Sequence, residues 1–433
     1  MSAWSKALSL AGQTPAKRNR AVDFYRVAAI VMVVAGHWVV NAFHYDDGGL
    51  TTARILTVQP WTQYLTWLFQ VMPVFFIVGG YANAASWASV AHDPEKRAAW
   101  PGGRVRRLLL PVVPLVFLWA AFALVANRAG LPPDLIRSAT RGGLIPTWFL
   151  AVYAGVTLLV PVTYAFWRRA GFASILAFAL AAALVDLVAF TGEADWLRWV
   201  NYGFVWLAAH QLGYWWQQAA PRPTAPWLLI LFGAASLWLL EGAFGYPVSM
   251  ISIPGAEVSN SSPPTFAMLS IGAIQAGLML LLSDRLSRWL QVPSRWAVVI
   301  LVGSRMMTIY LWHTSALVAA LGVALLLDGA GLRLAPGSGV WWLARLGWIA
   351  VLTAAILPFL LAFGWAETRA LRNPGVLPGA ARVVPGTLAA GLGIAFLALQ
   401  GASADTALGL NLVPIVATLG GVALATWSAA ARQ

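Results

Sequence analysis

The chain contains no cysteine, and this absence excludes disulfide bonds, thiolate nucleophiles and zinc sites with cysteine ligands. Charged residues are also scarce, at 10% of the 433 residues, whereas an ordinary soluble domain has about 25%. The sequence has no His-Glu-x-x-His segment, no Walker loop and no nucleophile elbow. We therefore predict no metal ion and no permanently bound cofactor.

Apolar residues dominate instead, at 60% of the chain. Runs of about 18 or more apolar residues can cross a bilayer as helices, and such runs recur along almost the whole sequence. The short alternating segments of a β-barrel are not seen. We therefore predict an all-α, polytopic transmembrane helical bundle with about ten core helices and two accessory C-terminal helices. The twelve runs lie near 22–44, 62–82, 108–127, 147–167, 172–190, 199–216, 226–244, 265–283, 297–327, 341–364, 386–401 and 408–428.

Pro- and Gly-rich or charged stretches separate the runs. One of them, "RNPGVLPG" (372–379), precedes the last two runs, which carry almost no polar residues. We predict one membrane domain over 1–373 and an accessory C-terminal transmembrane hairpin over 374–433. The loops are short, so any chemistry must take place within the membrane domain.

The 28 basic residues outnumber the 15 acidic ones, and most of them lie in loops between the apolar runs, whereas Arg26 and Arg305 lie inside runs. Positive charge collects in cytoplasmic loops, and the pattern predicts that both termini and the 83–107 loop are cytoplasmic. We expect a multi-pass protein of the inner (plasma) membrane that contacts the lipid bilayer. We expect no nucleic acid as a partner.

An arginine and a histidine stand in the first run, "RNRAVDFYRVAAIVMVVAGHWVV" (18–40). Arg26 and His37 are eleven residues apart, which in a helix is about 16 Å with both side chains on one face. Ionisable groups in a span are costly unless they face the protein interior. Arginine suits phosphate and histidine suits proton transfer. The alternatives are an interfacial anchor for Arg26 and a structural histidine at 37.

Further segments follow this pair in order: "MPVFFIVGGY" (72–81), "RVRRLLLPVVP" (104–114), "PTWFLAVY" (146–153) and "GSRMMTIYLWH" (303–313). Together they resemble acyltransferase family 3, the integral-membrane O-acyltransferases that use acyl-CoA. The chain departs from the family pattern at three places. No glycine follows Asp23, Gly79 replaces a serine, and Thr147 stands where a histidine or another polar residue often precedes Trp-Phe-Leu.

The resemblance implies transfer of an acyl group, expected to be acetyl, from cytoplasmic acyl-CoA to a hydroxyl of a glycan, lipid or secondary metabolite. His37 matches the catalytic histidine, expected to act as general base, and Arg26 matches its partner. Direct transfer and an acylated histidine both stay open. Arg104 and Arg107 match the basic pair for the donor. With Arg106 they form a cytoplasmic run suited to the phosphates of CoA, although topology alone also explains such a run.

Other polar residues are weaker candidates. Supporting roles are considered for His313, Tyr310, Ser304, Arg305, Asp23 and Glu241. Asp186 and Glu241 fall near the outer ends of runs, where an exposed interfacial carboxylate is the simpler interpretation, and His44 is expected at the outer interface.

Two functions of other classes compete with acyl transfer. Twelve spans also suit a secondary transporter or flippase, although transporters often contain two similar halves and no duplication is seen. A non-catalytic scaffold would not need Arg26 and His37 on one face.

Overall fold

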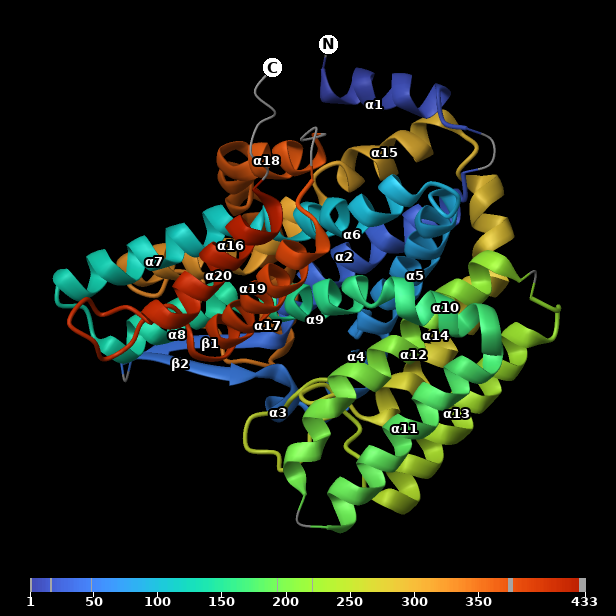
Figure 1. Ribbon diagram of the computed structural model, residues 1–433. Coiled ribbons are helices and arrows are strands. Elements are labelled where there is room, and N and C mark those ends of the chain that lie inside the picture. Colours follow the sequence, from blue (N-terminus) through green and yellow to red (C-terminus); the bar gives the residue numbers. More distant parts are fainter. Residues whose placement is uncertain are drawn as a thin grey trace, which may run out of the picture. The chain divides into compact units, whose positions relative to one another are not determined.

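The computed structural model describes residues 2–15, 18–47, 49–192, 194–219, 221–372 and 377–427. α-Helices account for nearly all regular structure in these ranges, and eighteen of them have ten or more residues. The predicted all-α class is confirmed (Figure 1). The chain forms two compact units, here called the first and the second unit. The first unit consists of Met1–Gly36, Ala53–Ala88 and Val160–Met306, and the second of His37–Thr52, Ser89–Leu159 and Met307–Gln433.

The first unit begins with a short amphipathic helix and then contains long apolar helices. Its elements are α1 (Ala3–Gly12), most of α2 (Arg20–Val40), α3 (Ile55–Val58), the 3-10 helix η1 (Pro60–Leu65), α4 (Thr66–Phe69), α5 (Met72–Ser89), α10 (Val160–Ala170), α11 (Phe172–Thr191), the 3-10 helix η2 (Asp195–Val200), α12 (Asn201–Gln218), α13 (Ala225–Phe244), α14 (Phe266–Trp289) and α15 (Pro293–Gly303). Within it α11 packs against α12, α13 against α14 and α1 against α15 (Figure 1).

Glycine brings two helices of the first unit into backbone contact. A Cβ atom on Gly80 of α5 would lie 1.8 Å from the carbonyl oxygen of His210 on α12, and one on Gly213 would lie 2.0 Å from that of Ile77. Small residues allow such close approach between membrane helices. Asn83 Nδ2 and His210 Nε2 then lie 3.1 Å apart in the same contact.

Asp186, predicted to be an exposed interfacial carboxylate, is buried in the first unit with 1% of its surface exposed. Its carboxylate accepts hydrogen bonds from Asn201 Nδ2 at 2.8 Å, the Tyr246 hydroxyl at 2.9 Å and the backbone N–H of Phe266 at 2.7 Å. Burial, and then the Asp186 charge, raise the pKa of Tyr246 above its usual value. The carboxylate therefore ties α11 to α12 and to the start of α14.

The second unit starts in the last turn of α2 and holds a β-hairpin that the sequence did not predict. Its elements are β1 (Asn41–Asp46) paired with β2 (Gly49–Arg54), α6 (Pro94–Leu109), α7 (Val112–Arg128), α8 (Pro133–Leu144), α9 (Thr147–Leu158), α16 (Met306–Leu326), α17 (Gly339–Ala355), α18 (Leu357–Leu371), α19 (Ala380–Gln400) and α20 (Leu412–Thr426). Helices α19 and α20 pack against each other, and α19 packs against α9 (Figure 1). The predicted domain boundary at 373–374 lies outside the described residues.

Among the described residues, eight helical segments are long and apolar enough to cross a membrane, or up to ten if each of two bent helix pairs is one span. The eight are Arg20–Val40, Pro60–Ser89, Pro94–Arg128, Phe172–Thr191, Ala225–Phe244, Phe266–Trp289, Met306–Leu326 and Ala380–Gln400. One bent pair is α17 with α18, which meet at 46°. The chain is therefore a multi-pass membrane protein.

One predicted helix is divided in the structure. The apolar run at 297–327 predicts a single helix, but α15 ends at Gly303 and α16 begins at Met306. Ser304 and Arg305 form the break, and both are exposed. Two consecutive polar residues can leave a helix more readily than they can be buried among apolar side chains.

Candidate active site

His37 meets a second histidine within the second unit. His37 Nδ1 lies 2.8 Å from His313 Nε2, and the two rings stack with centroids 5.0 Å apart and planes 23° apart. His313 is fully buried, whereas His37 is only partly buried. His313 is thus the enclosed member of the pair.

The backbone carbonyl of Tyr310 determines which nitrogens of this pair carry protons. His313 Nδ1 lies 2.6 Å from the Tyr310 carbonyl oxygen, which can only accept, so Nδ1 is the donor. Burying a charged ring without a partner is costly, so His313 is neutral and its Nε2 accepts. His37 Nδ1 must then donate in the 2.8 Å contact. The lone pair of a neutral His37 is therefore on Nε2.

Hydrogen bonds from three elements hold the part of α16 that carries His313. The Tyr310 hydroxyl donates to the carbonyl of Pro146 at 2.7 Å, and Thr314 Oγ1 donates to that of Gly143 at 3.3 Å. Trp38 Nε1 donates to the His313 carbonyl at 3.0 Å. These contacts fix α16 against the α8–α9 junction and against the last turn of α2.

A carboxylate that the sequence analysis missed holds the start of the same helix. Glu367 of α18 accepts from the backbone N–H groups of Met307 at 3.0 Å and Thr308 at 3.1 Å, and from Thr308 Oγ1 at 2.7 Å. The first N–H groups of a helix have no partner inside it, and negative charge is favoured there. Glu367 and Thr308 are 59 positions apart, so no local sequence pattern could reveal this cap.

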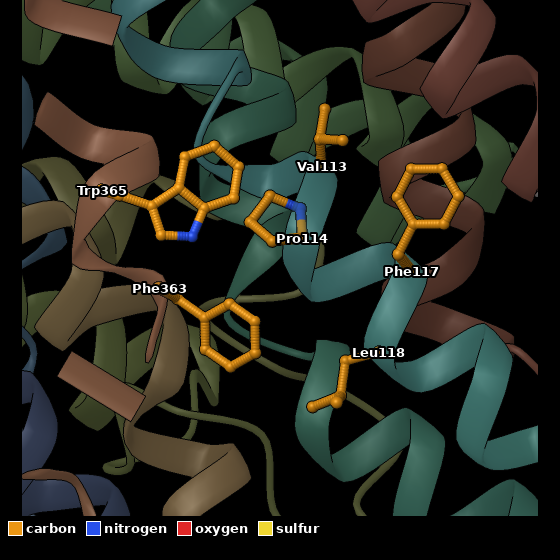
Figure 2. Close-up of a pocket in the computed structure, with 6 residues that line it drawn as sticks. All are labelled: Val113, Pro114, Phe117, Leu118, Phe363 and Trp365. Atoms are coloured by element: carbon orange, nitrogen blue, oxygen red, sulfur yellow. The ribbon is translucent and has the colours of Figure 1, made fainter. Parts of the chain in front are cut away.

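An apolar cavity of about 430 Å³ lies near this helix in the second unit. Figure 2 shows the six side chains that line it: Val113, Pro114, Phe117, Leu118, Phe363 and Trp365. The Phe363 ring also stacks on Trp312, with centroids 4.0 Å apart. The Phe363 ring thus lies between the cavity and Trp312, the residue that precedes His313.

Arg26 belongs to the first unit, where it shares one carboxylate with a second arginine. Arg26 Nη2 lies 3.3 Å from Asp23 Oδ1, and Arg18 Nε lies 2.7 Å from Asp23 Oδ2. Arg26 Nε is buried and has no hydrogen-bond partner among the described residues. Arg26 and His37 are both carried by α2, as predicted.

The three arginines near the end of α6 have different surroundings in the second unit. The Arg104 guanidinium lies over the Trp100 ring, 5.4 Å from its centroid. Arg106 Nη1 donates to the carbonyls of Ala370 at 2.8 Å and Arg372 at 2.9 Å, at the end of α18. Arg107 is exposed. Arg106 thus binds the C-terminal carbonyls of a helix, and Arg107 is open to a ligand.

The weaker site candidates are divided between the two units. Ser304 and Arg305 belong to the first unit, whereas Tyr310 and His313 belong to the second. Glu241 of α13 also belongs to the first unit, and its Oε1 is buried without a hydrogen-bond partner among the described residues.

His44 lies on β1, where its Nδ1 donates to the carbonyl of Leu334 at 3.2 Å. No group of three or more His, Cys, Asp or Glu side chains that could hold a metal ion is present in the described part of the chain.

Comparison with known proteins gives one decisive match. The acyltransferase domain of acyltransferase family 3 matches residues 19–363, and the chain belongs to that family. It is therefore a membrane acyltransferase, and the transporter and scaffold interpretations are set aside. No curated protein and no solved structure matched the chain.

Proposed function

We propose that the protein is an O-acyltransferase that moves an acyl group, expected to be acetyl, from cytoplasmic acyl-CoA to a hydroxyl of a glycan, lipid or small-molecule acceptor. His37 is the general base of this reaction. The observation that carries the proposal is the hydrogen bond between His37 and His313, with its tautomers set by the Tyr310 carbonyl. Family membership supplies the reaction class.

The reaction needs one group that accepts a proton and later returns it. The acceptor hydroxyl gives its proton to His37 Nε2 while its oxygen attacks the carbonyl carbon of acyl-CoA. The C–O bond forms as the C–S bond breaks, and the sulfur leaves with the electron pair. The imidazolium then protonates the CoA thiolate, so the products are an O-acyl ester and CoA.

His313 acts as a positioning residue in this proposal. Its Nε2 accepts from His37 Nδ1, which keeps the lone pair of His37 on Nε2 and steadies the ring when His37 becomes positive. His313 is fixed in turn by the Tyr310 carbonyl and by Trp38. A base held in one tautomer and one orientation needs no rearrangement before proton transfer.

The donor is assigned to basic residues. CoA carries a 3′-phosphate and a pyrophosphate, and charge-assisted hydrogen bonds from arginine suit both. Arg107 is exposed on α6 and Arg104 stands one turn before it. Arg26 is a second candidate for a phosphate because its Nε has no hydrogen-bond partner among the described residues.

The acylated compounds of cells that make the wild-type protein, compared with those of cells that make a His37 variant, test this function directly. Cells that make the wild-type protein should accumulate hydroxyl compounds heavier by one acyl group, and cells that make His37→Ala at equal level should not. Mass spectrometry of lipids, glycans and small metabolites would identify the acceptor and the acyl chain. The same acylated products at the same level in both cell lines would refute the catalytic role of His37.

A further inference from the structure

A polar cleft of about 480 Å³ lies in the second unit, between α8 and the connection from α19 to α20. Helix α8 contributes Arg137, Ser138 and Arg141, the end of α19 contributes Gln400, and the connection contributes Asp405 and Asn411. The family match ends at residue 363. One wall of the cleft therefore comes from a part of the chain that the family model does not include.

The charges of the cleft favour an anion. Arg137 lies 3.5 Å from Asp405 and 3.8 Å from Asp134, but these carboxylates are 86% and 97% exposed, and such surface pairs contribute little. No carboxylate among the described residues lies within 4.0 Å of Arg141. Two guanidinium groups thus face one exposed carboxylate in the cleft, and hydroxyl and amide groups stand beside them.

The cleft is connected to the histidine pair through α8. Arg141 precedes Gly143 by two residues, which is about 3 Å along the helix axis. The Gly143 carbonyl accepts from Thr314, the residue after His313. Positions two apart in a helix are rotated by about 200°, so the cleft at Arg141 and the contact at Gly143 lie on different faces of the same helix.

We propose that this cleft binds the phosphate of a phosphorylated acceptor, and that it thereby selects the substrate whose hydroxyl is acylated. The proposal rests on the O-acyltransferase function proposed above and defines its acceptor class. Two arginine forks, the Ser138 hydroxyl and the Asn411 amide offer several donors to phosphate oxygens. The phosphate can belong to a lipid headgroup or to a soluble molecule.

The binding test uses the full chain in phosphatidylcholine nanodiscs and glycerol 1-phosphate as the probe. The probe should raise the thermal unfolding midpoint in a saturable way, whereas glycerol and KCl at matched ionic strength should not. Arg141→Gln should weaken the apparent affinity about ten- to a hundredfold, because a charge-assisted contact is lost. The matched control is Arg128→Gln, an exposed arginine of α7 outside the cleft, which should keep the wild-type affinity.

A second variant and a lipid arm complete the test. Asn411→Ala should weaken binding several-fold while the protein still unfolds cooperatively. Phosphatidylglycerol added to the nanodiscs should compete with the probe if the acceptor is a lipid, and absence of competition would indicate a soluble acceptor. An unchanged midpoint with saturating probe, or wild-type affinity in Arg141→Gln, would overturn the proposal.

A further variant separates the cleft from the proposed function. His37→Ala should bind glycerol 1-phosphate as the wild type does and yet transfer no acyl group. With a cell extract as acceptor, the probe should slow CoA release by the wild type. Probe binding that leaves CoA release unchanged would overturn the acceptor assignment. A wild-type protein that binds the probe but releases no CoA with any extract would instead contradict the proposed function.

Discussion

His37 and His313 are 276 residues apart in the chain and 2.8 Å apart in the structure. Each was a site candidate on its own sequence surroundings, since a histidine inside an apolar run is costly without a partner or a task. Their contact could not be predicted, because it depends on how α2 and α16 pack. The order of donors and acceptors, from the Tyr310 carbonyl through His313 to His37, is likewise visible only in the structure.

We expect His313→Ala to slow acyl transfer without weakening acyl-CoA binding, because His37 loses the acceptor that fixes its tautomer. The loss should be smaller than the ~10²–10⁴-fold loss for removing the base itself. His313→Gln should recover part of the rate, since its Oε1 can accept from His37 Nδ1. Rates and CoA affinities of the purified variants check this. Equal rates for the Ala and Gln variants would argue against a positioning role.

At the scale of elements, the last two turns of α6 carry three arginines with separable roles. Arg104→Ala with Arg107→Ala should weaken acyl-CoA binding by on the order of 3 kcal/mol, because two charge-assisted contacts are lost. The effect should shrink at high salt. Arg106→Ala is the matched control, because Arg106 binds carbonyls at the end of α18. It should lower the unfolding midpoint more than the CoA affinity. Calorimetric titration that finds unchanged affinity in the double variant would leave these two residues with a topological role only.

Helix α16 depends on Glu367, which accepts three hydrogen bonds at its start. Glu367→Ala should lower stability by at least ~2 kcal/mol, since hydrogen bonds to a charged group are worth about 1.5–3 kcal/mol each. The stability of Glu367→Gln should lie between that of the wild type and that of Glu367→Ala, because the amide oxygen still accepts hydrogen bonds. Thermal unfolding in nanodiscs measures both. A midpoint unchanged in Glu367→Ala would contradict the capping role.

How well each element could be predicted follows from the range of the forces that form it. Long apolar runs reveal spans because the bilayer fixes their length, so both ends of α11 and α13 lie within one residue of prediction, and α14 begins within one residue of it but ends six residues later. The break at Ser304 was missed because two polar residues stand inside an otherwise continuous apolar run. The hairpin from Asn41 to Arg54 was missed because the first run was extended through residue 44. The Glu367 cap could not be predicted, because it joins two segments that are 59 residues apart in the sequence.

At the scale of the whole molecule, the distribution of basic residues predicts that both termini and the 83–107 loop are cytoplasmic. A reporter enzyme that is active only outside the cytoplasm, fused at residue 95, should therefore give no signal. The same reporter in the α7–α8 connection, at residue 131, should be active. A strong signal at residue 95 would reverse the orientation and remove Arg104 and Arg107 from the donor side.

The proposed reaction depends on His37 as the base, and CoA release by purified His37→Ala tests this role most directly. The substitution should lower acceptor-dependent CoA release about 10²–10⁴-fold and leave acyl-CoA affinity nearly unchanged, because the ring moves a proton and does not hold the phosphates. His44→Ala is the matched control, a second histidine of the same unit that bonds a backbone carbonyl, and it should keep most of the activity. Wild-type CoA release by folded His37→Ala protein would contradict the account.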